Sequence, residues 1–316
     1  MRVTVLGLGL VGGSVAQALT GHQVLGWDPS PEAVAAASAW GLPVAADLGS
    51  ALDGADLVVL AAPVGANDDL LAEVLGRRPD VLVTDVGSVK VPLVQRWQAL
   101  GSRGRLVPGH PMAGSESSGF AAADPALLVG ARWVLSPGPW CTQQDWLAVA
   151  ELVLSTGAVV VPAHPVAHDE AVALASHAPH VLAAVLGATT AGSSLAQALA
   201  AGSFRDLTRV SAAPPGRTGE FLFANRQPLA EVLHRVADEL RAVAEELEEM
   251  DRSALMSLLT EGHAARAAWE TSRTPALETQ VPLGDEGWAE ELHALAAAGG
   301  VVTALTGHLL TVGVRA

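Results

Sequence analysis

One histidine lies in a run of small residues, PGHPMAGSESSG (108–119), where the chain could carry out proton transfer. Pro111 holds His110 away from helical backbone angles, and the neighbouring glycines leave space for a ligand. A neutral imidazole, whose ordinary pKa is about 6.5, can accept the proton of a hydroxyl while hydride leaves the same carbon. His110 is therefore a candidate general base, although a histidine in a loop is more often structural or solvated.

Two further candidates occur in TDVGSVK (84–90), which continues the apolar run VLVTD (81–85). The carboxyl ends of strands in an open α/β sheet face the ligand crevice, so these residues are expected at the same edge as His110. Lys90 is the only lysine in the chain, which favours a functional or site-orienting role over a chance position at a helix start. Ser88 can cap the following helix or hydrogen-bond a catalytic group.

The first apolar run leads directly into a glycine-rich turn, GLGLVGGS. Its glycines fit the pattern G-x-G-x-x-G at Gly7, Gly9 and Gly12. In that pattern the glycines allow a tight turn, close approach of the backbone to a pyrophosphate, and close helix packing. Asp28 ends the second run, where a carboxylate would accept hydrogen bonds from ribose hydroxyls and repel a 2′-phosphate. Pro63 ends the third run and is assigned to the same site, which is predicted to bind NAD.

Four histidines occur in AHPVAHDEAVALASHAPH (163–180). A metal site is not expected, because no cysteine or H-E-x-x-H motif is near and His168 and His177 would lie on opposite helix faces. His177 and His180 can share one face, and Pro179 would break or kink the helix between them. These two histidines either line a pocket or pack at a contact between domains.

Strand and helix signals alternate along residues 1–163. Short apolar runs between helical stretches predict a doubly wound parallel sheet of the Rossmann type. The runs are 2–7, 23–27, 57–63, 81–85, 132–136 and 158–162. Helical patterns dominate residues 164–272, which predicts an all-helical second domain.

One long helix of this second domain is amphipathic. Its apolar residues recur every three or four positions, at Leu229, Val232, Leu233, Val236, Leu240, Val243 and Leu247. A helix of this length needs a large partner surface, either within its own subunit or on a second one, and the sequence favours a homodimer. The acidic cluster 245–251 is expected to be a solvated face.

Charge and composition oppose several classes of function. The formal net charge of −15 and the lack of a Lys/Arg block oppose binding to nucleic acid or an anionic membrane. No uninterrupted apolar run approaches the roughly 20 residues of a membrane span. The single cysteine, Cys141, cannot form an intramolecular disulfide, which agrees with a reducing compartment. We therefore expect a cytoplasmic protein that holds any anionic ligand with a few specific cations.

Five ordered blocks together resemble the prephenate dehydrogenase (TyrA) family of tyrosine biosynthesis. They are GLGLVGGSVA, TDVGSVK, GHPMAGSESSGF, HDEAVALASHAPH and SFRDLTRVSA, and the resemblance runs from Met1 to about Met250. It implies a Rossmann domain followed by a helical domain that forms a dimer. The sequence departs from the family pattern at Ala178, where leucine is common, and at Pro214, Pro215 and Gly216, where a continuous helix start is usual.

The resemblance also implies roles for individual residues. His110 would deprotonate the C4 hydroxyl of prephenate, and Ser88 would hydrogen-bond the same centre. His180 would lie in the substrate pocket, with His177 beside it. Arg209 would hold a substrate carboxylate, and Asn225 fits the asparagine that the family has in this stretch.

The implied reaction is NAD-dependent oxidative decarboxylation of prephenate to 4-hydroxyphenylpyruvate. Arogenate, in which an amine replaces the side-chain keto group, is an alternative substrate. A β-hydroxyacid dehydrogenase would be expected to have a catalytic lysine in its helical domain, where this chain has none. A non-catalytic NAD-binding sensor on the same scaffold is the alternative from another class.

The segment 276–316 reads as a strand, a helix and two short strands. It is weakly similar to the first part of an ACT regulatory module, which some members of the family use to bind tyrosine. It is either a truncated or dimer-completed module of that kind, or a small βαββ appendage that stabilises the dimer.

Overall fold

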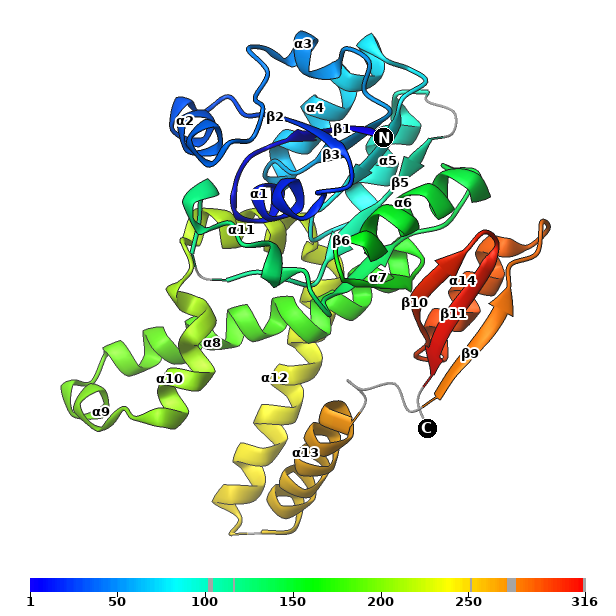
Figure 1. Ribbon diagram of the computed structural model, residues 1–316. Helices are drawn as coiled ribbons and strands as arrows, with labels where there is room; N and C mark the ends of the chain where they lie inside the picture. Colours follow the sequence, from blue (N-terminus) through cyan, green and yellow to red (C-terminus); the bar gives the residue numbers. More distant parts are fainter. Residues whose placement is uncertain (102–104, 116, 251, 272–276, 315–316) are drawn as a thin grey trace.

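A computed structural model describes residues 1–101, 105–115, 117–250, 252–271 and 277–314 (Figure 1). The predicted boundary between the helical domain and the C-terminal segment, 272–276, lies outside the described residues.

The N-terminal region contains a parallel five-stranded sheet with the order β2-β1-β3-β4-β5. Its strands are β1 (Arg2–Leu6), β2 (Gln23–Trp27), β3 (Leu57–Leu60), β4 (Leu82–Asp85) and β5 (Leu106–Val107). The helices between them are α1 (Leu10–Ala18), α2 (Pro31–Trp40), α3 (Leu48–Leu52), α4 (Val64–Arg77) and α5 (Val91–Ala99). The continuous apolar runs are buried because helices cover the sheet. The strand order reverses between β1 and β3, which is where such sheets bind ligands.

The last two apolar runs of this half do not join that sheet, although they were expected in it. The run β7 (Arg132–Leu135) pairs in parallel with β8 (Val159–Pro162), and β7 also pairs antiparallel with β6 (Gly109–Pro111). Pro108, which has no backbone N–H to donate, separates the two-residue strand β5 from β6. The chain therefore starts a second sheet immediately before His110. Helix α6 (Gln143–Ser155) connects β7 to β8.

The C-terminal segment has the predicted strand, helix and two strands, but it is joined to this second sheet. Its elements are β9 (Leu277–Pro282), α14 (Trp288–Ala297), β10 (Val301–Thr306) and β11 (Leu309–Val314). Strand β10 pairs antiparallel with β8 through Val302 and Val160, which gives a sheet of order β6-β7-β8-β10-β11-β9. Val302, Leu310 and Val312 are buried in the same core as the first sheet. The segment therefore completes the core, whereas the sequence suggested a separate appendage.

The helical region begins with one continuous helix, made of α7 (Pro165–Val172), a π-helical turn (Ala173–His177) and α8 (Ala178–Ala191). Pro179 does not end this helix as expected. It follows the π-helical turn, whose wider spacing accommodates the missing N–H and the bulk of the ring. This helix, Pro165–Ala191, is long and apolar enough to cross a membrane by length and composition alone, and 28% of an apolar 18-residue stretch of it is buried. The remaining helices are α9 (Ser194–Leu199), α10 (Gly202–Thr208), α11 (Pro215–Ala224), α12 (Arg226–Glu248) and α13 (Ser253–Thr271).

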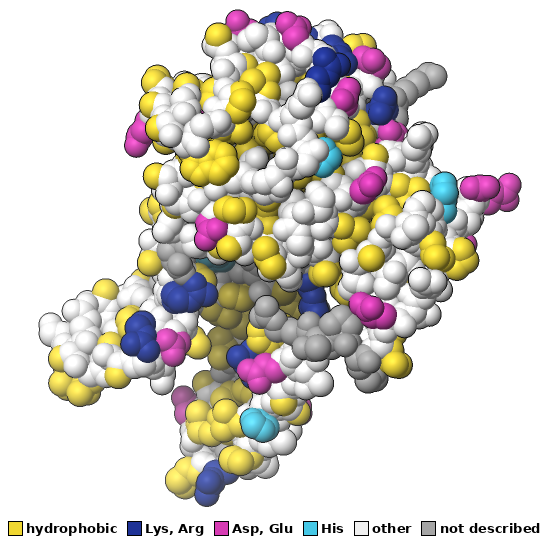
Figure 2. Space-filling view, viewed as in Figure 1, with side chains coloured by type: hydrophobic (Ala, Val, Ile, Leu, Met, Phe, Trp, Pro, Cys, Tyr) yellow, Lys and Arg dark blue, Asp and Glu magenta, His cyan; other side chains and the backbone are white. Residues whose placement is uncertain are grey.

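Only the first part of the amphipathic helix α12 is covered. Leu229 and Val232 are buried, whereas Leu240 and Leu247 are 58% and 51% exposed. Helices α12 and α13 project away from the body of the molecule, and hydrophobic side chains are visible on their surface (Figures 1 and 2). The solvated face expected for the acidic cluster agrees with the exposure of Glu245 and residues 247–250, whereas Glu246 is half-buried.

Candidate active site

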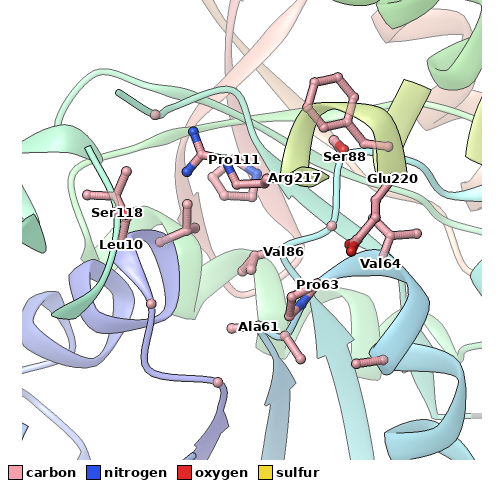
Figure 3. A pocket seen from close by; sticks show the side chains of 18 of the residues that line it. Leu10, Ala61, Pro63, Val64, Val86, Ser88, Pro111, Ser118, Arg217 and Glu220 are labelled. Carbon is pink, nitrogen blue, oxygen red and sulfur yellow. The ribbon is translucent and has the colours of Figure 1, made fainter. Parts of the chain in front are cut away.

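A single cleft of about 950 Å³ brings together most of the residues singled out in the sequence (Figure 3). It lies at the carboxyl end of the parallel sheet and is bounded on its other side by α8 and α11. Its lining includes Gly7, Gly9, Asp28, Pro63, Ser88, His110, His177, His180 and Arg209. Gly12 and Asn225 do not line it, and their positions are described below.

The glycine-rich turn forms the nucleotide end of the cleft. Gly7 has a φ of +105°, and a Cβ atom there would lie 2.5 Å from the backbone of Ala61. Gly12 packs so closely that a Cβ atom would lie 2.0 Å from the carbonyl oxygen of Gly7. Gly9, the N-cap of α1, instead faces open space. The three positions therefore fit what a dinucleotide-binding turn requires, with a tight turn at Gly7, close helix packing at Gly12 and open space at Gly9.

The carboxylate of Asp28 is fixed at the end of β2 by two backbone donors. Its Oδ2 atom accepts a hydrogen bond from the N–H of Leu8 at 2.7 Å, and Oδ1 accepts one from Ser30 at 2.8 Å. A carboxylate oxygen can accept more than one hydrogen bond. Asp28 therefore supports the glycine-rich turn and remains able to accept from ribose hydroxyls.

His110 is held by a second histidine, His168 of α7. Its Nδ1 atom lies 2.9 Å from His168 Nε2, and His168 Nδ1 lies 2.7 Å from Oδ1 of Asp169. Because a carboxylate only accepts hydrogen bonds, His168 donates from Nδ1; with a single proton on the ring, its Nε2 atom then accepts from His110. The Nδ1 atom of His110 thus carries the hydrogen. Its Nε2 atom is left with a free lone pair, as a proton acceptor requires.

Asp169 also caps helix α5. Its two carboxylate oxygens accept hydrogen bonds from the N–H groups of Lys90 and Val91, both at 2.8 Å. These N–H groups lie at the start of the helix and have no partner within it. Ser88 is therefore not the cap of this helix, which was one of its two expected uses. Its side chain lines the cleft instead.

Lys90, the only lysine in the chain, positions strand β6, which contains His110. The side chain of Lys90 is buried and pairs with Asp85 at the end of β4, and it donates a hydrogen bond to the carbonyl oxygen of Gly109 at 2.6 Å. Asp85 also accepts from the N–H of Gly109 at 2.9 Å and from that of Gly87 at 2.8 Å. Lys90 thus ties the first sheet to the residue preceding His110, which is the site-orienting role considered above.

Asn225 holds His177 from behind the cleft. Its side-chain NH₂ group donates to the carbonyl oxygen of Asp169 at 2.8 Å and contacts Nδ1 of His177 at 3.0 Å. Nδ1 of His177 accepts, so the other ring nitrogen, Nε2, carries the hydrogen. Asn225 is buried, and the structure places it as a support of His177, away from the lining where substrate was expected to contact it.

The histidines of the cleft are neutral near pH 7. Burial is the main reason that the pKa of His110 is well below its ordinary value, and His168, Lys90 and His177 lower it further. Burial likewise lowers the pKa of His177 to about 4. Burial also lowers the pKa of His180, with smaller contributions from Arg217 and Arg209. The cleft can therefore offer an acceptor at His110 and a donor at His177. No group of three or more metal-binding side chains occurs within the described residues.

Both parts of the chain match models of one family. Residues 11–162 match the nucleotide-binding domain of prephenate dehydrogenase, and residues 164–261 match its dimerization domain. This chain belongs to the prephenate dehydrogenase family. It is 35% identical over 264 residues to prephenate dehydrogenase of Bacillus subtilis, an alignment that covers 78% of this chain and 71% of the relative.

Two solved structures agree with the membership in the prephenate dehydrogenase family. A Corynebacterium glutamicum protein, provisionally named a prephenate dehydrogenase, is 34% identical with a TM-score of 0.86, covering 94% of this chain and 97% of that one. The prephenate dehydrogenase of Aquifex aeolicus, in complex with hydroxyphenyl propionate and NAD+, is 26% identical with a TM-score of 0.78. This match covers 85% of this chain and 98% of that one.

Several residues of the site were missed as functional candidates in the sequence. His168 and Asp169 were seen only as part of the histidine-rich segment, and the contact of His168 with His110 joins positions 58 residues apart. Arg217, which lines the cleft on α11, was not singled out either. The adjacent His-Asp pair was the one local signal, because a carboxylate next to a histidine can fix its tautomer.

Proposed function

We propose that the chain catalyses the NAD-dependent oxidative decarboxylation of prephenate to 4-hydroxyphenylpyruvate. The observation that carries this proposal is the free Nε2 of His110, which shares one cleft with the glycine-rich turn and Asp28. Membership in the family and the NAD+ in the Aquifex aeolicus structure support the cofactor and the substrate class. The carboxylate of Asp28 favours NAD over NADP, because it would repel a 2′-phosphate.

The residues of the chain would act on the C4 hydroxyl and on the carboxylates of the substrate. When bound, NAD supplies the hydride acceptor. His110 accepts the hydroxyl proton at Nε2, and His168 and Asp169 stabilise the resulting imidazolium through its Nδ1–H. Loss of the ring carboxylate as CO2 leaves an aromatic phenol, which makes the reaction effectively irreversible. Ser88 would hydrogen-bond the hydroxyl, which is supported by its place in the lining of the same cleft as His110, His177 and His180.

Arg209 would bind a substrate carboxylate, because its planar guanidinium can donate to two oxygens at once. Arg209 lies in the helical region, across the cleft from the nucleotide end. This arrangement would fix the ring with its hydroxyl toward His110. Orientation of the reacting carbon and a base are the main requirements of this reaction.

The test is NADH formation by the purified protein with prephenate and, in parallel, with arogenate, each with NAD and with NADP. We expect turnover of prephenate with NAD, and a weaker preference for NAD in Asp28→Ser. Faster turnover of arogenate than of prephenate would leave the proposed mechanism in place and make arogenate the substrate. Binding of NAD without turnover of either compound would indicate that the protein is a non-catalytic NAD-binding sensor.

We also propose a homodimer in the cytoplasm. The match to a dimerization domain and the exposed apolar residues of α12 and α13, including Leu240, Leu247, Met256 and Leu259, support self-association. Burial of such a face is favourable at roughly 25 cal/mol per Å² of apolar surface. Sedimentation equilibrium would test the dimer, and a monomer at micromolar concentration would contradict it.

A further inference from the structure

The charged residues of the cleft are unevenly distributed. Among the described lining residues, Asp28, Asp69 and Glu73 come from the N-terminal domain, whereas Arg209 and Arg217 come from the helical region. Glu220, the other acid among the described lining residues, shares helix α11 with Arg217. Figure 3 shows that the two side chains diverge, Glu220 toward Val64 and Arg217 toward Pro111 and Ser118. The substrate end of the cleft therefore has two cations on one wall.

Arg217 reaches across the cleft to the loop that follows His110. Its Nη2 atom donates to the carbonyl oxygen of Ser115 at 3.2 Å, and Nη1 donates to that of Ser117 at 3.4 Å. A guanidinium has five N–H donors, so these two long contacts leave others unused. Among the described residues, no carboxylate forms an ion pair with Arg217. Arg217 lines the same cleft as His180, and its positive charge contributes, after burial, to lowering the pKa of His180.

The chemistry of prephenate suits a pair of cations on one wall. Its ring carboxylate and its pyruvyl side chain, which ends in a second carboxylate, are both attached to C1, opposite the C4 hydroxyl. A ring with its hydroxyl at His110 therefore directs both carboxylates away from the base. Arg209 alone can satisfy one of them. In arogenate an ammonium group lies next to the side-chain carboxylate, and a second guanidinium would repel it.

We infer that Arg217 binds the side-chain carboxylate of the substrate and selects the keto acid prephenate over the amino acid arogenate. This inference rests on the proposed function, which it deepens by naming the residue that sets substrate preference. The carbonyl contacts of Arg217 hold its side chain over the cleft, so little conformational freedom is lost when the carboxylate binds. A charged hydrogen bond of this kind corresponds to about 10- to 100-fold in affinity. Since Arg217 is exposed, we expect the lower value.

The experiment compares wild type with Arg217→Gln, using both substrates and saturating NAD. We expect KM for prephenate to rise about 10-fold with kcat within about twofold, and KM for arogenate to stay level or fall. Arg217→Lys keeps the charge and loses the planar fork, so its KM for prephenate should lie between the values of wild type and Arg217→Gln. Arg226→Gln is the matched control, because Arg226 is an exposed arginine at the start of α12 that stacks on Phe223 and does not line the cleft. Arg226→Gln should leave KM and kcat unchanged for both prephenate and arogenate.

A calorimetric titration of the cofactor-free protein with prephenate separates this inference from the proposed function. We expect Arg217→Gln to weaken prephenate binding about 10-fold and Arg226→Gln to leave it unchanged. An equal loss of affinity for both substrates would mean that Arg217 only holds the loop that follows His110 in place, and would overturn the inference. An unchanged KM and an unchanged binding constant would also overturn it. If wild type turns over neither compound, the proposed function fails, and the titration still decides whether Arg217 binds the keto acid.

Discussion

The Nδ1 atom of His110 lies 2.9 Å from the Nε2 atom of His168, and this contact determines which nitrogen of His110 can act as a base. His168 is in turn fixed by Asp169, which is itself fixed by the N-terminus of α5. Asp169 therefore caps the N-terminus of α5 and also orients His168 and, through it, His110. Proton acceptance at His110 consequently depends on side chains that do not line the cleft.

Replacing His168 should reduce turnover without preventing cofactor binding. In His168→Leu the Nδ1–H of His110 loses its acceptor, so either ring nitrogen can carry the hydrogen and the imidazolium loses its support. We expect kcat to fall by about 10- to 100-fold, less than the 10²–10⁴ expected for His110→Asn. His168→Gln, whose amide oxygen can accept from His110, should recover part of the loss. Equal kcat values in wild type and His168→Leu would show that His168 has no such role.

The acid limb of the pH profile should lie below pH 6.5. His110 must be neutral to accept a proton, and its pKa is lowered well below 6.5 by burial and by neighbouring histidines and Lys90. Activity is therefore retained as the pH falls through 6.5 and is lost only when His110 is protonated at lower pH. The measurement is kcat/KM for prephenate against pH. A limb at or above 6.5 would contradict the buried, neutral state of His110.

The glycines of the nucleotide turn should respond differently to alanine. Gly12→Ala places a methyl group against the carbonyl oxygen of Gly7, so we expect destabilisation of roughly 1–3 kcal/mol. Gly9→Ala meets open space and should change stability by less than about 0.5 kcal/mol, while NAD affinity falls. Urea unfolding and NAD titration measure the two effects. Loss of stability in Gly9→Ala with normal NAD affinity would reverse this assignment.

Loss of the only lysine should be costly to stability. Lys90→Met leaves Asp85 buried without its cation, and breaking a buried pair in this way costs about 3–5 kcal/mol. The control is Arg266→Gln, which removes an exposed ion pair with Glu270 and should cost less than about 1 kcal/mol. Urea unfolding of both variants tests the difference. Similar unfolding midpoints for Lys90→Met and wild type would indicate that the buried pair contributes little.

Local patterns in the sequence were sufficient to predict the nucleotide end of the site. The strand before Gly7, the spacing of the three glycines and the position of Asp28 all follow from short-range constraints on one turn. The same is true of the strand, helix and two strands near the C-terminus. Each of these features is determined by neighbouring residues, and the structure has them where the sequence indicated.

The features that depended on long-range packing could not be predicted in this way. No local pattern shows that Asp169 caps a helix that begins 78 residues earlier, or that Asn225 supports His177. Helix α7 must first pack at the carboxyl edge of the sheet before either contact exists. The second sheet is similar, because β8 resembles a strand of the first sheet in sequence, and one of its two partners, β10, comes from the distant C-terminal segment.

The pairing of Val302 in β10 with Val160 in β8 has a consequence for the order in which the protein can fold. The parallel sheet and its nucleotide turn use residues up to Val107 and can form early during synthesis, because domains tend to fold as they emerge from the ribosome. The sheet that contains His110 remains open along β8 until residues 301–314 have been translated. Such long-range pairing is slow, and it leaves an unpaired strand edge exposed in the meantime. Nascent chains are therefore expected to acquire the cofactor fold well before they acquire a completed catalytic sheet.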